Sequence, residues 1–366
     1  MGVQFIGMIQ PHEVSETIPH TGPAVDPAYV RVFAQAHEHA GFDRILVPAS
    51  ATSPDTLLTV AYAASVTQRI HFLLAHRPGF VSPTLSARQL ATLDNYTNGR
   101  VAVHYITGGS DEDQQRDGDF LGHDERYARS DEYIGLLRRV WTSEQPFDHA
   151  GTYYQAKGAW SEVKPVQSPY VPIYFGGASA PALQVAGKYA DVYALWGESL
   201  AQASDLVRQV RAAAAQHGRT VEFSISFRPI LGATEAEAWA KAEQILEDTR
   251  RLKVSQGFSR GGPQQSEGAR RLLADAAQGD RVDAHLWTAL ARENGGRSNS
   301  TSLVGTPEQV ADALLKYYDL GITTFLIRGF DPLVDTITYG RDLLPLVRQK
   351  VAEREREAEH LALKAA

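Results

Sequence analysis

The chain has 366 residues, a net charge of −7 and 43% hydrophobic residues, which is ordinary for a globular protein with a large core. The negative charge argues against a nucleic-acid-binding protein, whose surface is normally basic. The complete lack of cysteine excludes disulfides, iron–sulfur clusters and thiolate catalysis. The first ten residues, MGVQFIGMIQ, read as a strand and not as a signal peptide, and no segment is long and apolar enough to span a bilayer. We therefore expect a cytoplasmic protein without membrane or nucleic-acid partners.

Short apolar runs alternate with longer helical patterns along the chain, and this alternation predicts parallel βα units. We expect strands over residues 3–9, 43–48, 70–76, 100–106, 171–176, 191–196, 221–231 and 323–329. Eight such units predict an α/β fold of the (β/α)8 TIM-barrel type, whose active site lies at the carboxyl ends of the strands. A doubly wound open sheet is the alternative, but no GxGxxG turn follows the first strand.

Three longer segments interrupt the alternation, around residues 107–126, 143–170 and 251–300. We expect one barrel domain over residues 1–366 that carries these segments as insertions at its C-terminal face. The third segment contains QGFSRGGPQQSEGARR, which is rich in Gly, Gln, Ser and Arg. Such a composition is typical of a lid over a barrel site, and equally of a plain surface loop.

Two glycine pairs follow predicted strands, and each is a candidate anion cradle because bare backbone N–H groups can approach a phosphate there. The first, in ITGGSDEDQQRDGDF, precedes five acidic residues that would repel a phosphate. The second, in PIYFGGASAPALQ, has no nearby acid, and Ser179 begins a predicted helix. The second pair is therefore the better cradle, with a tight turn capped by Ser179 as the alternative.

A helix is predicted over HDERYARSDEYIGLLRRVW, which has acids in its early turns and a cationic pair near its end. His123 and Tyr127 are four residues apart and share one face of that helix. They could offer an imidazole N–H and a phenol O–H to an anion held by the second glycine pair. A polar histidine without a ligand is the alternative for His123.

Five stretches in order resemble the bacterial luciferase-like flavin-dependent monooxygenases, in particular the alkanesulfonate monooxygenase group. They are RPGFVSPTLSARQLATLDNYTNGRVAVHYITGG, HDERYARSDEYI, PIYFGGASAPA, DVYALWGES and SLVGTPEQVADALLKYYDLGITTFLIRGF. The resemblance covers nearly the whole chain and implies a TIM barrel with insertions. It also implies that reduced FMN is taken from a separate NAD(P)H-dependent flavin reductase, and that dioxygen is a co-substrate.

The resemblance assigns flavin-binding roles by position. The FMN phosphate is expected against Gly177, Ala178, Ser179, His123 and Tyr127, and the ring and ribityl chain against Ala75, His104 and Thr107. The family often has a strained cis peptide at the position of Ala75. The first glycine pair is then not the phosphate cradle, and its acids solvate a loop near the rim.

The resemblance also places a substrate end at the barrel mouth, with three departures from the family pattern. The expected residues are His12, Ser53, Trp196, Arg228, Arg297, Arg328 and Phe330, with Arg297 favoured over Arg292. Ser53 occupies a position where the family commonly has a cysteine, and Arg228 a position where the alkanesulfonate enzymes have a histidine. Arg328-Gly329-Phe330 replaces the Ser-Gly-Tyr of the family. Arginine stays protonated and recognises anions, so Arg228 is expected to hold a sulfonate rather than to act as a base. The loss of the tyrosine proton leaves His12 or the flavin itself to supply one.

We expect an FMNH2-dependent monooxygenase that cleaves the carbon–sulfur bond of an organosulfonate and releases sulfite and an aldehyde. A bulkier hydroxylated sulfonate such as sulfoquinovose suits the added arginines. The alternatives are a sibling monooxygenase acting on an amine, alkane or sulfone, a deazaflavin-dependent dehydrogenase, and a non-catalytic flavin-binding barrel. Metal catalysis is not expected, because the HEH at residues 37–39 reads as solvated helix residues. A homo-oligomer, either dimer or tetramer, is implied by the resemblance.

Overall fold

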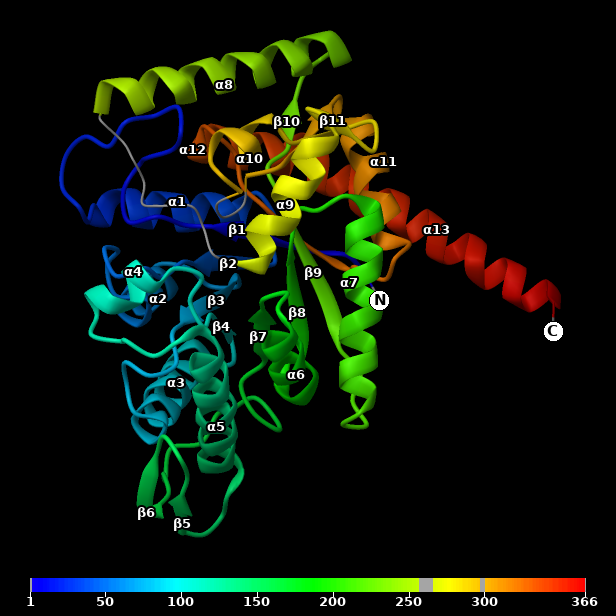
Figure 1. The fold of residues 1–366 in the computed structure, drawn as a ribbon. Helices are drawn as coiled ribbons and strands as arrows, with labels where there is room; N and C mark the ends of the chain where they lie inside the picture. The colour runs from blue at the N-terminus through cyan, green and yellow to red at the C-terminus, as the bar shows by residue number, and fades with distance from the viewer. Residues whose placement is uncertain (1, 257–265, 297–299, 366) are drawn as a thin grey trace.

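A closed barrel of eight parallel strands forms the centre of the computed structural model, which describes residues 2–256, 266–296 and 300–365 (Figure 1). The strands follow the order β1-β14-β9-β8-β7-β4-β3-β2 around the barrel. Their bounds are β1 Gln4–Met8, β2 Arg44–Val47, β3 His71–His76, β4 Val101–Tyr105, β7 Ile173–Gly176, β8 Val192–Trp196, β9 Glu222–Phe227 and β14 Thr324–Ile327. The predicted TIM barrel is confirmed, and the open-sheet alternative is wrong.

Alternation along each strand divides the side chains between two apolar regions, because successive residues point to opposite faces. One set fills the barrel interior around Ile6, Leu73, Ala102, Tyr174 and Val192. The other set packs under the surrounding helices and forms the largest cluster of the core. A strand buried on both faces reads as a continuous apolar run, which is why all eight could be found from sequence.

The seventh predicted strand, residues 221–231, is two strands in the structure. β9 ends at Phe227, and β10 (Ile230–Leu231) pairs with β13 (Ser302–Gly305) in a separate small sheet of order β10-β13-β12-β11. Pro229 lies at the break and has no N–H to donate to a ladder. The chain therefore leaves the barrel at Arg228.

Helices cover the outside of the barrel, as parallel strands require. The covering helices include α1 Pro27–His39, α2 Thr56–Ser65, α3 Pro83–Thr97, α5 His123–Thr142, α6 Ala180–Tyr189, α7 Leu200–Ala215, α11 Pro307–Tyr318, α12 Pro332–Thr338 and α13 Leu344–Ala365. A π-helical turn, Tyr339–Leu343, joins α12 to α13. α11 begins with a capping box in which Thr306 and Gln309 bond each other's backbone N–H, as the Thr-Pro entry predicts.

The three insertions carry their own secondary structure. The first contains α4 (Asp111–Arg116), and the second a hairpin of β5 (Phe147–Ala150) and β6 (Gln155–Ala159). The third is not an irregular loop: it contains the end of α8 (Glu235–Gln256), α9 (Glu267–Gln278), β11 (Arg281–Val282), β12 (Leu286–Trp287) and α10 (Ala289–Glu293). Most of the segment expected to be a lid, residues 257–265, lies outside the described residues.

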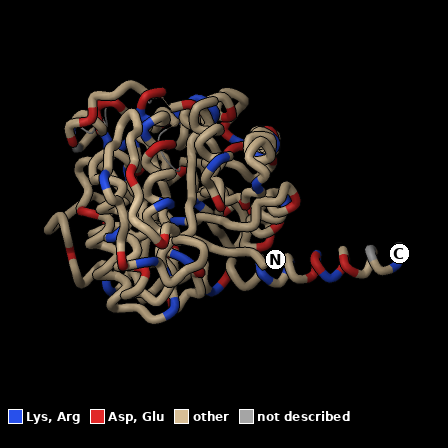
Figure 2. Tube along the Cα trace, turned by 90° about the horizontal axis from the view of Figure 1, so that it is seen from below, with Lys and Arg blue, Asp and Glu red and all other residues tan. Residues whose placement is uncertain are grey.

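Lysine and arginine alternate with aspartate and glutamate along the trace, and α13 projects from the body at its C-terminal end (Figure 2). Within the described ranges, no helix is both long and apolar enough to cross a membrane. The interpretation of the HEH motif is wrong for His37, which is 1% exposed and bonds to the Phe33 carbonyl. His37 packs behind β1, against Gly7.

Candidate active site

The second glycine pair forms a cradle between the end of β7 and the start of α6. Gly177 has φ +120°, and a Cβ there would lie 2.7 Å from the Tyr127 hydroxyl and 3.0 Å from the Ala182 Cβ. Ser179 is the N-cap residue of α6, but its side chain makes no capping bond. Its hydroxyl is buried and, apart from the neighbouring Tyr127 hydroxyl, has no polar partner among the described residues. A ligand oxygen at this point would complete its hydrogen bonding.

α5 brings His123 and Tyr127 to the same cradle, as the four-residue spacing predicts. The two rings lie 4.9 Å apart between centroids, and the Tyr127 hydroxyl borders Gly177. Burial raises the pKa of Tyr127, so the phenol stays protonated as a donor. The His123 Nδ1 lies 2.6 Å from Asp124, which fixes the orientation of the imidazole.

These features fit a phosphate group. The α6 N-terminus supplies backbone N–H groups and the positive end of a helix dipole, and the glycine keeps the approach open. Tyr127 and Ser179 add hydroxyl groups beside it. Their arrangement fits the terminal phosphate of FMN, as the sequence resemblance implies.

Two of the residues expected against the flavin ring lie side by side at the barrel mouth. Ala75 of β3 and His104 of β4 are in register, and a Cβ on Gly176 would lie 3.5 Å from the His104 Nε2. Burial lowers the pKa of His104 to about 4, so its imidazole is neutral near pH 7, and its Nδ1 is buried without a partner in the described part of the chain. The Ala75 carbonyl accepts a hydrogen bond from Thr56 at 3.0 Å.

One expectation about the ring site needs correction. The peptide at Ala75 is not cis: the one cis peptide in the described ranges is Ser168–Pro169. The Thr107 hydroxyl lies 3.2 Å from the Ser130 hydroxyl of α5, and Thr107 is 6% exposed. Thr107 therefore ties the β4 end to α5, and its contact with the flavin stays a prediction.

Arg228 and Arg328 lie near a carboxylate that no sequence motif predicted. Arg228 is fully buried, its Nη1 lies 2.8 Å from Glu16, and its Nη2 donates to the Gly329 carbonyl at 3.0 Å. Arg328 lies 3.6 Å from the other Glu16 oxygen. Burial acts to raise the pKa of Glu16, but the two guanidinium groups outweigh it and hold that pKa at about 2. The two guanidinium groups therefore share the Glu16 carboxylate, and the Asp335 carboxylate also acts on Arg228.

Phe330 lies in the core and not at an open face. It is 4% exposed, packs with Ile230, Trp239 and Trp287, and lies under the Arg228 guanidinium at 3.6 Å. This cation–π contact explains why an aromatic ring without a hydroxyl suits the position.

The other expected substrate residues are spread along the rim. His12 stacks on His20 with ring centroids 3.7 Å apart, and its Nδ1 contacts the Ala24 carbonyl at 2.8 Å. Ser53 makes a local turn, in which its hydroxyl bonds the backbone N–H and C=O of Ser50. That turn uses the Ser53 hydroxyl twice, so its expected role at the substrate is not supported by this geometry.

The third expected arginine, Arg297, lies outside the described residues. Arg292, the less favoured choice, is half-exposed in α10 and pairs with Asp280 at 2.7 Å. Its position on the surface agrees with the preference against it.

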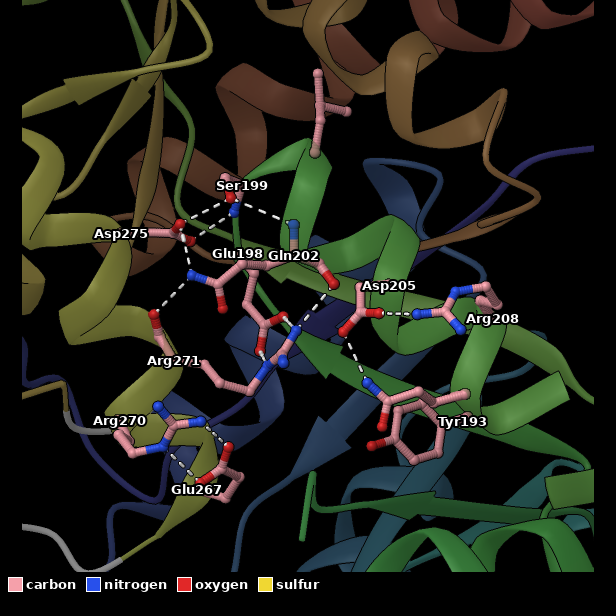
Figure 3. Close-up of polar contacts among 12 residues, drawn as sticks. Tyr193, Glu198, Ser199, Gln202, Asp205, Arg208, Glu267, Arg270, Arg271 and Asp275 are labelled. Carbon is pink, nitrogen blue, oxygen red and sulfur yellow. Dashed lines mark hydrogen bonds and ion pairs between the residues drawn. The ribbon is translucent and has the colours of Figure 1, made fainter. Parts of the chain in front are cut away.

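Trp196 ends β8 and faces α9. It is in register with Ser226 of β9, and a Cβ on Gly268 would lie 3.1 Å from its indole ring. Figure 3 shows the polar contacts that join α9 to the residues just after Trp196. α9 therefore covers this side of the mouth, which composition alone had suggested only as a lid or a surface loop.

Four of the five acids after the first glycine pair form ion pairs with arginines of other elements. Their pairs are Asp111–Arg126, Asp113–Arg77, Asp117–Arg77 and Asp119–Arg129. These pairs fasten the insertion to α5 and to the β3 end. The prediction of solvated acids is wrong for Asp119, whose side chain is 4% exposed, and agrees with the exposed side chains of Asp111 and Glu112.

Sequence reasoning missed three groups at this face, namely Glu16, Gly268 and the Glu198–Arg271 pair. None has a local signal: Glu16 lies in a loop, and Gly268 in a polar stretch. Only the packing of distant segments brings them to the barrel mouth.

A model of the family described as luciferase-like monooxygenase matches residues 5–324 of this chain. Among solved structures, a riboflavin lyase, RcaE, with modified FMN and riboflavin is similar with a TM-score of 0.78 and 21% identity, over 96% of this chain and 92% of that chain. The EDTA monooxygenase EmoA from Chelativorans sp. BNC1 has a TM-score of 0.75 and 18% identity, over 96% of this chain and 94% of that chain. DmoA from Hyphomicrobium sulfonivorans has a TM-score of 0.75 and 21% identity, over 95% of this chain and 88% of that chain. The structures share the fold, and the family match covers most of the chain, so this protein belongs to the luciferase-like monooxygenase family.

Proposed function

We propose that this protein is the oxygenase of a two-component system that uses reduced FMN and dioxygen to cleave an organosulfonate to sulfite and an aldehyde. A separate NAD(P)H-dependent flavin reductase supplies the reduced FMN. The observation that carries the substrate class is the pair of guanidinium groups, Arg228 and Arg328, that lies with Glu16 at the ends of β9 and β14.

The cradle residues hold the FMN phosphate in this proposal. Gly177 leaves the space, Ser179 and Tyr127 donate hydroxyl hydrogen bonds, and the α6 N-terminus favours the negative charge. Reduced FMN, when bound, supplies the two electrons that activate dioxygen. The neutral His104 imidazole lies at the ring side of the site, where its Nδ1 is open to a partner.

The arginine cluster orients the sulfonate. A sulfonate is a monoanion with three acceptor oxygens, which guanidinium groups bind through charge-assisted hydrogen bonds. Arg228 is held in place by Glu16 and the Gly329 carbonyl. It therefore attracts the sulfonate through its positive charge and without direct contact. Arg328 is 16% exposed, whereas Arg228 is fully buried, so we expect Arg328 to lie nearer a ligand. A hydroxylated sulfonate such as sulfoquinovose stays within this proposal.

Water exclusion is the remaining task of the chain. Trp196 and the first turn of α9 cover the mouth on the β8 side. A covered site protects a reactive oxygenating species from hydrolysis.

Sulfite release in air tests the proposal, with FMN and a flavin reductase supplying reduced flavin. The panel contains short alkanesulfonates, taurine-like sulfonates and sulfoquinovose, with the matching alcohols as controls. Sulfite from at least one sulfonate, and none from the controls, supports the proposal. No sulfite from any member, while FMN binds, refutes it.

One observation favours a second candidate, a family monooxygenase that acts on an uncharged or cationic substrate. Arg228 is fully buried and Glu16 occupies its Nη1, which leaves less positive charge for an anion than the sequence suggested. Oxidation of an amine, alkane or sulfone without sulfite release identifies this candidate.

The supply of reduced FMN also bears on location and assembly. We infer a cytoplasmic protein, because NAD(P)H-dependent reductases work where that cofactor is regenerated. An even homo-oligomer remains part of the proposal, and size-exclusion chromatography with light scattering tests it.

A further inference from the structure

α9 is anchored to the barrel by a buried two-point ion pair. The Arg271 Nε and Nη2 donate to the two oxygens of Glu198 at 2.8 and 2.6 Å. The two side chains are 11% and 2% exposed. A planar guanidinium that donates two parallel hydrogen bonds to a carboxylate fixes the relative orientation of the two groups as well as their distance.

A second contact lies one turn further along α9, at Asp275. Asp275 is fully buried and accepts hydrogen bonds from the Ser199 N–H and hydroxyl, both at 2.7 Å (Figure 3). Gln202 donates to Asp275 at 2.7 Å and to the Arg271 carbonyl at 3.0 Å. α9 is thus held along its length against the start of α7.

The anchor points follow Trp196 directly in the chain. Glu198 is two residues later, and its N–H donates to the Trp196 carbonyl at 2.8 Å. The Tyr317 hydroxyl donates to the Glu198 carbonyl at 2.8 Å. Thr301 donates to the Gly197 carbonyl at 2.7 Å. Trp196 and the point to which α9 attaches therefore form one rigid turn.

The first turn of α9 touches two separate parts of the barrel rim. Gly268 packs on the Trp196 ring, where an added Cβ would lie 3.1 Å away. Ser266, the N-cap residue of α9, packs against Gly109 of the first glycine pair. A Cβ added to Gly109 would lie 3.4 Å from the Ser266 Cβ. The first glycine pair thus makes room for α9 at its Gly109 member.

We propose that Arg271 is a positioning residue and Gly268 a specificity-determining residue for the substrate end of this enzyme. Arg271 acts through Glu198 to hold α9 on the rim, and Gly268 lets the first turn of α9 form a wall directly against Trp196. The size of the side chain at position 268 then limits the bulk of the substrate. The specificity part rests on the proposed function; the positioning part does not.

The neighbouring Arg270 provides a matched control. It is 68% exposed and forms an ion pair with Glu267 of the same helix, and this pair does not join α9 to the barrel (Figure 3). The test compares Arg271→Met, Arg270→Met and the conservative Arg271→Lys in the full-length protein.

Amide hydrogen exchange of α9 is the first measurement, with α6 as the internal reference. Removing one partner of a buried ion pair leaves the other charge unpaired, so α9 amides are expected to exchange at least about a hundredfold faster in Arg271→Met. Arg270→Met is expected to behave as wild type, and Arg271→Lys to recover part of the protection. The dissociation constant of oxidised FMN should stay within about twofold, because the cradle is built by α5 and α6. Unchanged α9 exchange in Arg271→Met overturns the positioning role.

Coupling of flavin oxidation to product is the second measurement. With α9 released, more of the reduced FMN should yield hydrogen peroxide and less should yield sulfite in Arg271→Met, with rescue by Arg271→Lys. An unchanged peroxide fraction overturns the link to the substrate end.

Gly268→Ala tests specificity with a series of sulfonates of increasing size. A methyl group against Trp196 should lower kcat/KM for the bulkiest substrate about tenfold more than for the smallest, with α9 exchange unchanged. Equal effects on all substrates overturn the specificity role. If the wild-type protein releases no sulfite, the proposed function fails, while the exchange result still decides the positioning role.

Discussion

Replacing Glu16 by glutamine removes the one carboxylate that lies between Arg228 and Arg328. The carboxylate is 2.8 Å from the first guanidinium and 3.6 Å from the second. Its pKa falls from 4.5 to about 2, and this difference corresponds to about 3 kcal/mol of stabilisation by the charged form. The substitution also leaves Arg228 fully buried with its charge uncompensated. We expect Glu16→Gln to lower the free energy of unfolding by about 3 kcal/mol near pH 7.

The stabilisation by Glu16 depends on pH in a direction that follows from its lowered pKa. Because the pKa of Glu16 is lower in the folded than in the unfolded protein, its stabilisation is complete above about pH 4.5. It is lost as the pH falls through the folded value of about 2. Urea unfolding of wild type and Glu16→Gln between pH 7 and pH 3 should show a difference that shrinks below about pH 4.5.

A surface pair supplies the control. Glu112 and Arg116 form an ion pair with side chains 58% and 52% exposed. Because solvent screens such a pair, Glu112→Gln should change stability by about 0.5 kcal/mol or less at every pH. The reasoning about Glu16 is refuted if Glu16→Gln is as stable as Glu112→Gln at pH 7. A difference that stays constant down to pH 3 refutes the pKa argument.

Three further changes test the cradle, the insertion and the ring site. Gly177→Ala should weaken FMN binding at least tenfold by fluorescence titration, because the methyl group meets Tyr127, whereas Gly158→Ala, also at positive φ but in open space, should leave the affinity unchanged. Asp119→Asn should lower stability by about 3 kcal/mol in urea unfolding, because its partner arginine is nearly buried; a loss below about 1 kcal/mol contradicts this. His104→Gln should reduce the loss of unfolding free energy between about pH 6.5 and 4, because the folded imidazole, with its pKa lowered to about 4, takes up a proton less readily than the unfolded chain does. An unchanged slope of the unfolding free energy against pH would contradict this.

Local patterns determined the barrel. Each strand is a continuous apolar run bounded by turn residues, and such runs report burial on both faces without knowledge of the partner strands. The largest boundary error, at β9 and β10, came from reading apolar residues through Arg228-Pro229, although proline cannot continue a ladder. The cradle at Gly177 and Ser179 was also predictable, because a helix start and its glycine are adjacent in sequence.

The substrate end was decided by tertiary structure. Arg228 and Arg328 were recognised as unusual, but their charges depend on Glu16, which is 212 residues before Arg228 in sequence. The acids near Asp119 were read as solvated because their arginine partners lie on other elements. Ion pairs depend on distance in space and on burial, and neither follows from the order of residues in one chain.

The sequence by itself therefore determined the eight-stranded barrel, the glycine turn and helix start at Gly177 and Ser179, and the family resemblance. Only the folded chain showed that α9 lies on Trp196 and that Glu198 holds Arg271 there. The physical reason is that strand and helix starts are encoded by periodicity and neighbouring residues, whereas the cover of the site depends on contacts between segments far apart in the chain.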